Sequence, residues 1–187
     1  MSDELLEIYI RQLIEVHQVP EVTFNWQGGE PTLMGLNFFQ HALDLQRKYG
    51  NPGIQIHNTI QTNATILTDA WCLFFHDSNF LVGVSLDGPR QFHDAYRVDK
   101  NGSQTFDRVM NGISLLHRHG VAFNILTSVH AANADNGLEV YRFLRNEVRA
   151  QFIQFIPIVE YDNAAGFPKG VKVTDRSVTG RKYGQFL

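Results

Sequence analysis

A short stretch at residues 24–33 could bind a ligand, because a strand-like sequence runs into two glycines, a carboxylate and a proline: FNWQGGEPTL. Glycines at the end of a strand let a ligand approach the backbone. Pro31 keeps Glu30 away from helical angles, so its carboxylate is rigidly placed to accept hydrogen bonds from an ammonium group. The alternative is a tight β-to-α turn with a solvated glutamate, and the stretch alone leaves both interpretations open.

A second candidate is Arg97, which lies in HDAYR after the loop sequence SLDGP. Arginine is the natural bidentate partner of a carboxylate, although a surface pair with Asp94 is the commoner arrangement. Ser85 either donates to a ligand or satisfies the backbone. A fixed carboxylate at Glu30 and a guanidinium near the same opening would hold the two ends of an amino acid.

The sequence offers little for a metal site. His117 and His119 fall in the last turn of an expected helix, where cations suit the helix dipole, and the remaining histidines lack the spacing of metal ligands. Cys72 is the one cysteine of the chain and is expected to be a small core residue. No residue of this chain is therefore predicted to bind a metal.

Two carboxylates that follow strands, Asp87 and Glu160, make a barrel glycosidase conceivable. Sugar-binding enzymes usually expose tryptophans along the substrate, whereas Trp26 and Trp71 lie on faces that are expected to be buried. A glycosidase is therefore the weakest alternative.

Hydrophobic periodicity predicts five strands, with a helix before the first strand and in each of the four gaps. The first helix has Leu6, Tyr9, Leu13 and Val16 on one expected stripe, and Thr68 is the expected N-cap of the third helix. The expected strands are 22–26, 54–62, 80–86, 121–129 and 151–159, and the expected helices are 3–17, 36–50, 69–77, 105–120 and 137–148.

Strands that alternate with helices of this length indicate an α/β fold with a parallel sheet. Polar residues follow each strand, where the loops of a parallel array meet above one opening. A Rossmann sheet would need a glycine-rich phosphate turn such as GxGxxG, which GGEP is not. A barrel or partial barrel is therefore the preferred architecture.

The bulk composition is that of a soluble globular protein, with 43% hydrophobic and 19% charged residues among 187. A net charge of −3 without a long basic run excludes nucleic acid or an anionic membrane as the main partner. No apolar run approaches the ~20 residues of a membrane span, and a single cysteine indicates a reducing compartment. These features predict a cytoplasmic protein.

Six segments of the sequence resemble one known family, the anaerobic sulfatase-maturating enzymes. This family belongs to the radical S-adenosylmethionine (SAM) superfamily, in the branch with an additional cluster-binding C-terminal (SPASM) domain. The resemblance runs from about Val22 to Glu160 with order and spacing preserved. GGEP marks the superfamily, whereas WQGGEPTL with VSLDGP and HDAYR narrows the match to this branch. The segments are FNWQGGEPTLMGLNFF, QTNATIL, FLVGVSLDGPRQFHDAYR, GSQTFDRVMNGISLL, FNIL and QFIQFIPIVE.

The resemblance implies a partial (β/α)6 TIM-like barrel that holds a [4Fe–4S] cluster and SAM. In this family a 5′-deoxyadenosyl radical oxidises a Cys or Ser of a sulfatase to Cα-formylglycine, with an external electron donor. By position, Gly28, Gly29 and Glu30 would meet the SAM amino group, Ser85 and Arg97 its ribose and carboxylate end, and Val159 its adenine. Weaker candidates for contact with the substrate peptide are Gln27, Gln61 and Asn63.

Two departures from the family pattern matter more than any match. The CxxxCxxC motif that binds the cluster is missing, and one cysteine cannot supply three ligands. The resemblance therefore implies a barrel over 1–160 without its first strand and cluster loop, truncated at both ends. Residues 161–187 are expected to be an irregular segment that leads toward an absent auxiliary-cluster domain. We expect this chain alone to be inactive, with no catalytic residue of its own. A smaller departure is Ala64, where the family usually has glycine.

Two alternatives remain beside the sulfatase-maturase interpretation. One is a related radical SAM enzyme that modifies peptides differently, for example by forming a thioether crosslink, and the other is a non-catalytic remnant that binds SAM or a peptide. The barrel residues do not separate these classes, because substrate choice depends on segments outside the resemblance.

Overall fold

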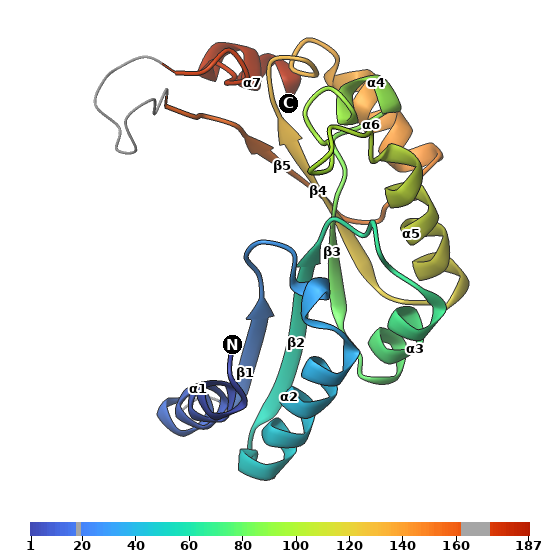
Figure 1. Cartoon of the computed structure of the whole chain (residues 1–187). Helices are drawn as coiled ribbons and strands as arrows, with labels where there is room; N and C mark the ends of the chain where they lie inside the picture. Colours follow the sequence, from blue (N-terminus) through green and yellow to red (C-terminus); the bar gives the residue numbers. More distant parts are fainter. Residues whose placement is uncertain (18–19, 162–172) are drawn as a thin grey trace. The chain divides into compact units, whose positions relative to one another are not determined.

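The computed structural model describes residues 1–17, 20–161 and 173–187, in which helices alternate with strands (Figure 1). The expected helices and strands are all present, with bounds that differ by a few residues. The strands are β1 (Glu21–Trp26), β2 (Gln55–Thr62), β3 (Leu81–Ser85), β4 (Phe123–Val129) and β5 (Ile153–Pro157). The described helices are α1 (Asp3–Val16), the short 3-10 helix η1 (Pro31–Met34), α2 (Leu36–Tyr49), α3 (Asp69–Asp77), α4 (Arg90–His93), α5 (Phe106–Arg118), α6 (Gly137–Asn146) and α7 (Gly180–Phe186).

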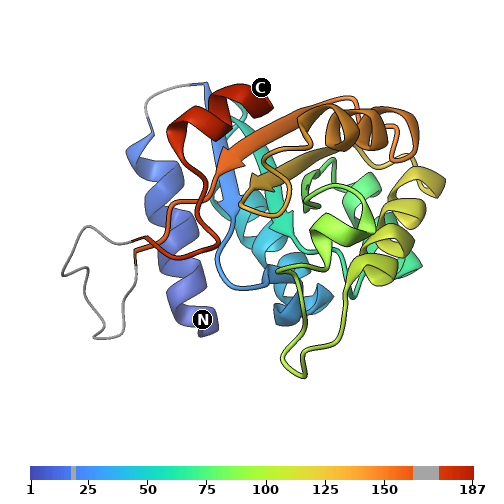
Figure 2. The ribbon, with the colours of Figure 1, turned by 90° about the horizontal axis from the view of Figure 1, so that it is seen from above.

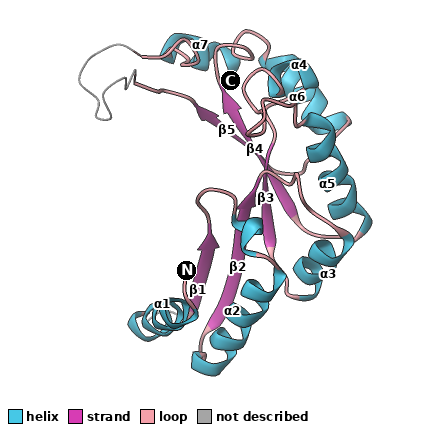
Figure 3. Ribbon diagram, in the orientation of Figure 1, coloured by secondary structure: helices cyan, strands magenta, loops and turns pink. Residues whose placement is uncertain are grey.

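The strands form a five-stranded sheet in the order β1-β2-β3-β4-β5 (Figure 3). β1 pairs in parallel with β2, and β4 pairs in parallel with β5. A strand order that follows the sequence without reversal is typical of a barrel-type β/α array, whereas a Rossmann sheet reverses at its switch point. The helices in the gaps serve as the crossovers that parallel strands require.

The chain divides into two compact units. The first unit contains Met1–Thr62, Ile66–Gly83 and Leu115–Ala122, and the second contains Asn63–Thr65, Val84–Ser114 and Phe123–Leu187. β3 and α5 each contribute residues to both units.

The first unit buries one face of β1 beneath α1 and α2. Burial alternates strictly along β1, and the buried side chains are Val22, Phe24 and Trp26. Tyr9 of α1 packs edge-on against Phe24 and Trp26, and Figure 2 shows α1 beside the blue strand β1. The side chains between these residues point to the opposite face of β1 and are exposed.

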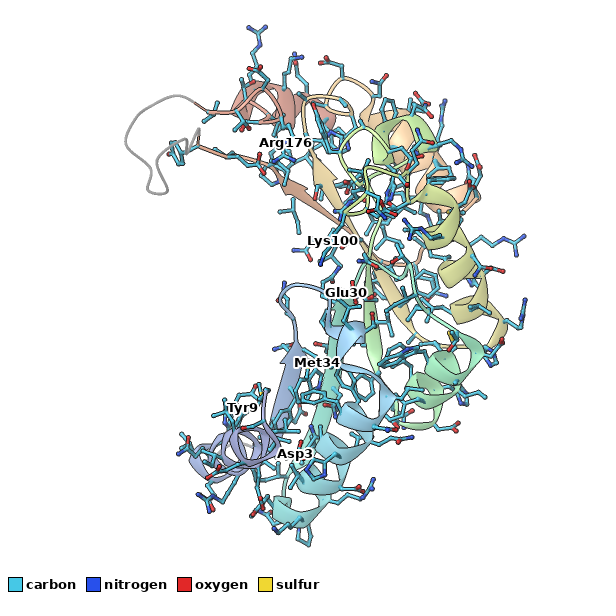
Figure 4. All side chains as sticks on the ribbon, viewed as in Figure 1. Asp3, Tyr9, Glu30, Met34, Lys100 and Arg176 are labelled. Carbon is cyan, nitrogen blue, oxygen red and sulfur yellow. The ribbon has the colours of Figure 1, made fainter. Side chains whose placement is uncertain are left out.

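The predicted apolar stripe of α1 is partly wrong. The buried residues are Leu6, Ile10 and Ile14, which recur every four positions, as neighbours on one helix face do. Val16 ends the helix and is 75% exposed, and Tyr9 lies at the margin of the face (Figure 4). Residue types alone did not distinguish the two stripes, because apolar side chains occupy both.

An aromatic cluster forms the centre of the first unit and includes both tryptophans, which are buried as expected. Phe39 of α2 contacts Trp26, Trp71 and Phe80 edge-on. The Trp26 indole N–H donates to Asn58 Oδ1 at 2.9 Å, and the Gln46 amide donates to the same oxygen at 3.0 Å. The polar atoms that this core buries are therefore paired, as burial requires. Thr68 caps α3 as predicted, because its side chain accepts from the backbone N–H of Trp71.

The second unit includes a helix in the region that was expected to be irregular. Residues 162–172 lie outside the described part of the chain, but α7 follows them and is capped by Thr179. Phe186 of α7 is buried, packs against Phe155 of β5 at 5.0 Å between ring centroids and approaches Gly137 of α6. A helix of seven residues shows little periodicity, so its residue pattern indicates a helix only weakly.

The loop after β2 packs against α5 through a glycine. Ala64 adopts a left-handed backbone conformation with φ +57°, which glycine adopts more easily. Its carbonyl oxygen would lie 2.3 Å from a Cβ added at Gly112. Backbone and helix therefore approach so closely here that position 112 has no room for a side chain.

Replacing Gly112 with alanine should therefore destabilise the chain, although alanine is the better helix former. We expect the free energy of unfolding in urea to fall by about 1–3 kcal/mol, the usual cost of overpacking. The matched control is Gly184→Ala in α7, where an added Cβ meets no atom within 4 Å and stability should rise by up to ~1 kcal/mol. Equal shifts for the two variants would contradict the close approach.

Candidate functional site

The loop that leaves β1 presents bare backbone to its surroundings. Gly28 and Gly29 have φ values of +108° and +53°, and a Cβ added at either position would meet no atom within 4 Å. The glycines are therefore required by backbone conformation, and the space beside them is open. This open space leaves room for the predicted approach of a ligand to the backbone, which stays a prediction.

Glu30, which Figure 4 labels, ends the same loop. Hydrogen bonds hold its side chain in place. Its Oε1 atom accepts from the Thr32 backbone N–H at 3.1 Å, from the Thr32 hydroxyl at 2.6 Å and from the Thr62 hydroxyl at 2.7 Å. Its backbone is extended, with φ −126° and ψ 104°, as expected before Pro31. Both threonines fix the carboxylate, and Glu30 caps the turn into η1, so the tight turn of the alternative interpretation is present.

Two candidates for substrate contact lie near this loop within the first unit. Gln27 is exposed directly after β1, and Gln61 is the half-buried penultimate residue of β2. Because neighbouring residues of a strand face opposite ways, Gln61 points away from the side on which Thr62 reaches Glu30.

Asn63, the first residue of the second unit, makes side-chain hydrogen bonds within its own loop. Its Oδ1 accepts from the backbone N–H of Thr65 at 2.9 Å and from the Thr65 hydroxyl at 2.7 Å. This arrangement is an Asx turn, which shapes the loop after β2.

Arg97 pairs with Asp87 in the second unit, and the expected surface pair with Asp94 does not form. The Arg97 Nε and Nη2 atoms donate to Asp87 Oδ2 at 2.5 Å and Oδ1 at 3.0 Å, and Nη2 also donates to Ser128 Oγ at 3.1 Å. Asp94 instead accepts from the backbone N–H groups of Thr105, which precedes α5, and of Phe106, its first residue.

Asp87 is the centre of a buried polar network that sequence reasoning considered only for a glycosidase. Its side chain is 2% exposed, and Oδ1 also accepts from the Ser128 backbone N–H at 2.8 Å. The Asn133 amide donates to the backbone carbonyls of Asp87 and Ser128 at 3.1 and 2.9 Å. Both strand-end carboxylates are ion-paired, since Glu160 pairs with Arg176, so neither resembles a free glycosidase acid or base.

Two buried histidines lie beside this network. His130 places Nε2 3.7 Å from Asp87 Oδ2, and neither of its ring nitrogens has a hydrogen-bond partner among the residues that the structure describes. Burial lowers the pKa of His130, against the opposing effect of Asp87. Burial also lowers the pKa of His93 to about 4. Both imidazoles are therefore neutral near pH 7.

The remaining predicted contacts also lie in the second unit. Ser85 is the last residue of β3, is half-buried and lies two positions before Asp87. Val159 follows β5 and is 56% exposed. The structure thus gathers Gln27, Gly28, Gly29, Glu30 and Gln61 in the first unit. The second unit holds Asn63, Ser85, Arg97 and Val159, and a single cradle built from both units stays a prediction.

The residues of this chain do not fit a [4Fe–4S] cluster. Cys72 is fully buried in α3, and burial raises the pKa of its thiol to about 11, whereas a cluster ligand is a thiolate. Across residues 1–17, 20–161 and 173–187, no group of three or more His, Cys, Asp or Glu side chains is placed to hold a metal ion.

Each unit by itself holds groups that suit one part of SAM. In the first unit, the fixed carboxylate of Glu30 and the accessible backbone at Gly28 and Gly29 suit its ammonium group. In the second unit, the guanidinium of Arg97 suits its carboxylate.

Comparison with known proteins identifies the class. The sequence model of the Radical SAM superfamily matches residues 1–144. The chain therefore belongs to the radical SAM superfamily.

Similar proteins narrow the resemblance to sulfatase-maturating enzymes. The chain is 44% identical to the serine-type anaerobic sulfatase-maturating enzyme of Bacteroides thetaiotaomicron, over 100% of this chain and 47% of that protein. It is 38% identical to the cysteine-type enzyme of Clostridium novyi, over 86% of this chain and 42% of that protein. Both comparisons agree with the family resemblance expected from the motifs.

A solved structure confirms the fold class. The structure described as native anSMEcpe with bound AdoMet and Cp18Cys peptide matches with a TM-score of 0.87 and 34% identity, over 100% of this chain and 50% of that chain. The partial TIM-like radical SAM fold is therefore confirmed. The chain spans about half the length of the relatives it matches. Among the described helices, none has the length and apolar character needed to cross a membrane.

Removing the hydroxyl of Thr62 should loosen Glu30. Thr62→Val keeps the shape of a buried side chain but removes a donor to a carboxylate, so the free energy of unfolding should fall by about 1.5–3 kcal/mol. The control is Thr59→Val on the same strand, whose hydroxyl donates to the neutral Asn25 and should contribute about 0.5–1.5 kcal/mol. An equal or smaller loss for Thr62→Val in urea unfolding would contradict the role of Thr62.

The free energy of unfolding should decrease as the pH is lowered below neutrality, because His93 is buried in its neutral form. Its pKa is about 4 in the folded chain and ~6.5 when unfolded, so the unfolded state binds a proton first as pH falls. Between those two pH values the free energy of unfolding should decrease by up to about 3 kcal/mol. Urea titrations of His93→Gln should show a shallower pH dependence, whereas the exposed His57→Gln control should follow the parent chain. Identical slopes for all three would exclude His93.

Proposed function

We propose that the chain forms the SAM-binding part of an enzyme that oxidises a side chain of a sulfatase to Cα-formylglycine. The observation that carries the proposal is the 44% identity to a serine-type sulfatase-maturating enzyme across this whole chain. The glycine loop with its fixed Glu30 supports it. SAM would supply a 5′-deoxyadenosyl radical that removes a hydrogen atom from Cβ of the target residue.

The residues of this chain would bind and orient SAM. Glu30 accepts hydrogen bonds from the ammonium group, backbone at Gly28 and Gly29 lies against the same end, and Arg97 donates to the carboxylate. Ser85 and Val159 complete the proposed contacts with the ribose and adenine, and Gln27, Gln61 and Asn63 those with the peptide. The threonines that hold Glu30 keep the acceptor in place before SAM arrives, which lowers the entropic cost of binding.

The [4Fe–4S] cluster would be held by cysteines that are not among these residues, since Cys72 does not fit a ligand. We therefore propose that the chain alone does not catalyse the oxidation. The whole reaction requires the cluster, an external electron donor and the sulfatase polypeptide, and we place it in the cytoplasm.

A serine is the favoured target residue. The serine-type relatives are 44%, 41% and 40% identical to the chain, whereas the cysteine-type relatives are 38%, 35% and 34% identical. The difference is small but has the same direction for every relative compared, and it guides the choice of peptide below.

A chimera tests the proposed function. The aligned segment of the Bacteroides thetaiotaomicron enzyme is replaced with this chain, so that the remainder of that enzyme surrounds it. With SAM, a reductant and a serine-containing sulfatase peptide, we expect the peptide to lose two hydrogen atoms and to react with a hydrazine. A thioether crosslink requires a cysteine, also loses two hydrogen atoms and forms no hydrazone, so mass spectrometry after hydrazine treatment distinguishes the two products.

Glu30→Gln in the chimera should weaken SAM binding by about tenfold or more, because a charge-assisted contact to the ammonium group is lost. Glu21→Gln, at the exposed start of β1, is the charge-matched control and should bind SAM normally. A folded chimera that forms no aldehyde would refute the maturase function, and equal SAM affinities for Glu30→Gln and Glu21→Gln would remove Glu30 from the SAM site.

A further inference from the structure

The guanidinium of Arg97 is occupied on one edge and open on another. Asp87 receives hydrogen bonds from Nε and Nη2, and Ser128 receives a further one from Nη2. Nη1 has no hydrogen bond to any residue that the structure describes, and the side chain is 29% exposed. Nη1 is therefore the donor that remains for a ligand, because the edge that usually binds a carboxylate in bidentate fashion is already filled by Asp87.

The positive charge of this guanidinium is balanced by a carboxylate in direct contact with it. Asp87 carries one negative charge against the positive charge of Arg97, and their closest contact is 2.5 Å. The imidazoles of His93 and His130 are neutral near pH 7, because burial lowers the pKa of both. The nearby Arg176 is neutralised by Glu160 at 2.8 Å. The network thus offers a directed hydrogen-bond donor without net positive charge.

We propose that Asp87 is a positioning residue that orients Arg97 and cancels its charge, so that the site accepts a ligand without net negative charge and rejects phosphate-bearing nucleotides. The proposal rests on the proposed function in taking SAM as the accepted ligand. SAM and ATP share adenosine, but SAM carries an ammonium, a sulfonium and a single carboxylate, whereas ATP carries a polyanionic chain. An arginine whose charge is not cancelled would favour ATP. Specificity often depends on features that disfavour the wrong ligand, as Asp87 would do here.

Asp87 has a structural role as well, since it also accepts from the Ser128 backbone N–H. A loss of stability in an Asp87 variant would therefore show only that the network holds the fold together. Charge selection makes a different prediction, because removing one negative charge should change the preference between two adenosine ligands of opposite charge. If Asp87 had only a structural role, replacing it would weaken the binding of SAM and of ATP alike.

The experiment measures the reaction of Arg97 with phenylglyoxal, an arginine reagent, by peptide mass spectrometry of the full chain. In the parent chain, SAM should slow modification of Arg97, and ATP at the same concentration should not. In Asp87→Asn, modification should be about tenfold faster, the factor expected when one charge-assisted hydrogen bond is released. ATP should now protect Arg97 in this variant.

Asp107→Asn is the matched control. Asp107 forms an exposed bidentate pair with Arg90 in the same unit, so the variant has the same net charge as Asp87→Asn. It should accelerate modification of Arg90 and leave Arg97 unchanged. Ser128→Ala frees one Nη2 donor without altering charge, so ATP should still fail to protect Arg97. If Asp87→Asn does not fold, the inference is still tested by Ser128→Ala and by the preference of the parent chain for SAM over ATP.

Two outcomes would overturn the inference: equal modification of Arg97 in the parent and Asp87→Asn chains, or equal protection of the parent chain by ATP and SAM. If SAM gives no protection while Asp87→Asn still accelerates modification, SAM binding and ligand selection fail, and the charge cancellation by Asp87 stands. The failure of the proposed function is in this way distinguished from the failure of the positioning role.

Discussion

A buried carboxylate must be neutralised by hydrogen bonds and an opposite charge, or its burial becomes very costly. The second unit meets this requirement at Asp87, which receives two hydrogen bonds from Arg97 and one from the Ser128 backbone. The neighbouring backbone is fixed as well, because the Thr127 hydroxyl donates to the Leu86 carbonyl. The loop after β3, the end of β4 and the guanidinium are therefore held by one set of contacts.

The carboxylate of Glu30 in the first unit is held by a different set of donors from that of Asp87. Glu30 is half-buried and is held on Oε1 by hydroxyl and backbone donors that carry no charge. These donors fix the position of the carboxylate within the first unit.

Much of this arrangement followed from the sequence, because it depended on local patterns. Strand and helix positions followed from periodicity, the cap at Thr68 from residue type, and the GGEP loop from the conformational preferences of glycine and proline. The short helices η1 and α4 were not predicted, since four residues complete barely one turn. The choice of Asp87 over Asp94 as the partner of Arg97 was also out of reach. Both aspartates lie within ten residues of the arginine in sequence, and only tertiary packing decides between them.

Both tryptophans of the chain, Trp26 and Trp71, belong to the first unit. Indole emission therefore reports the environment of that unit alone, whereas far-ultraviolet circular dichroism reports helices and strands in both. If the two optical signals change at different denaturant concentrations, the transition is not two-state and the units unfold separately. Coincident midpoints would mean that β3 and α5, which contribute to both units, join them into one cooperative structure.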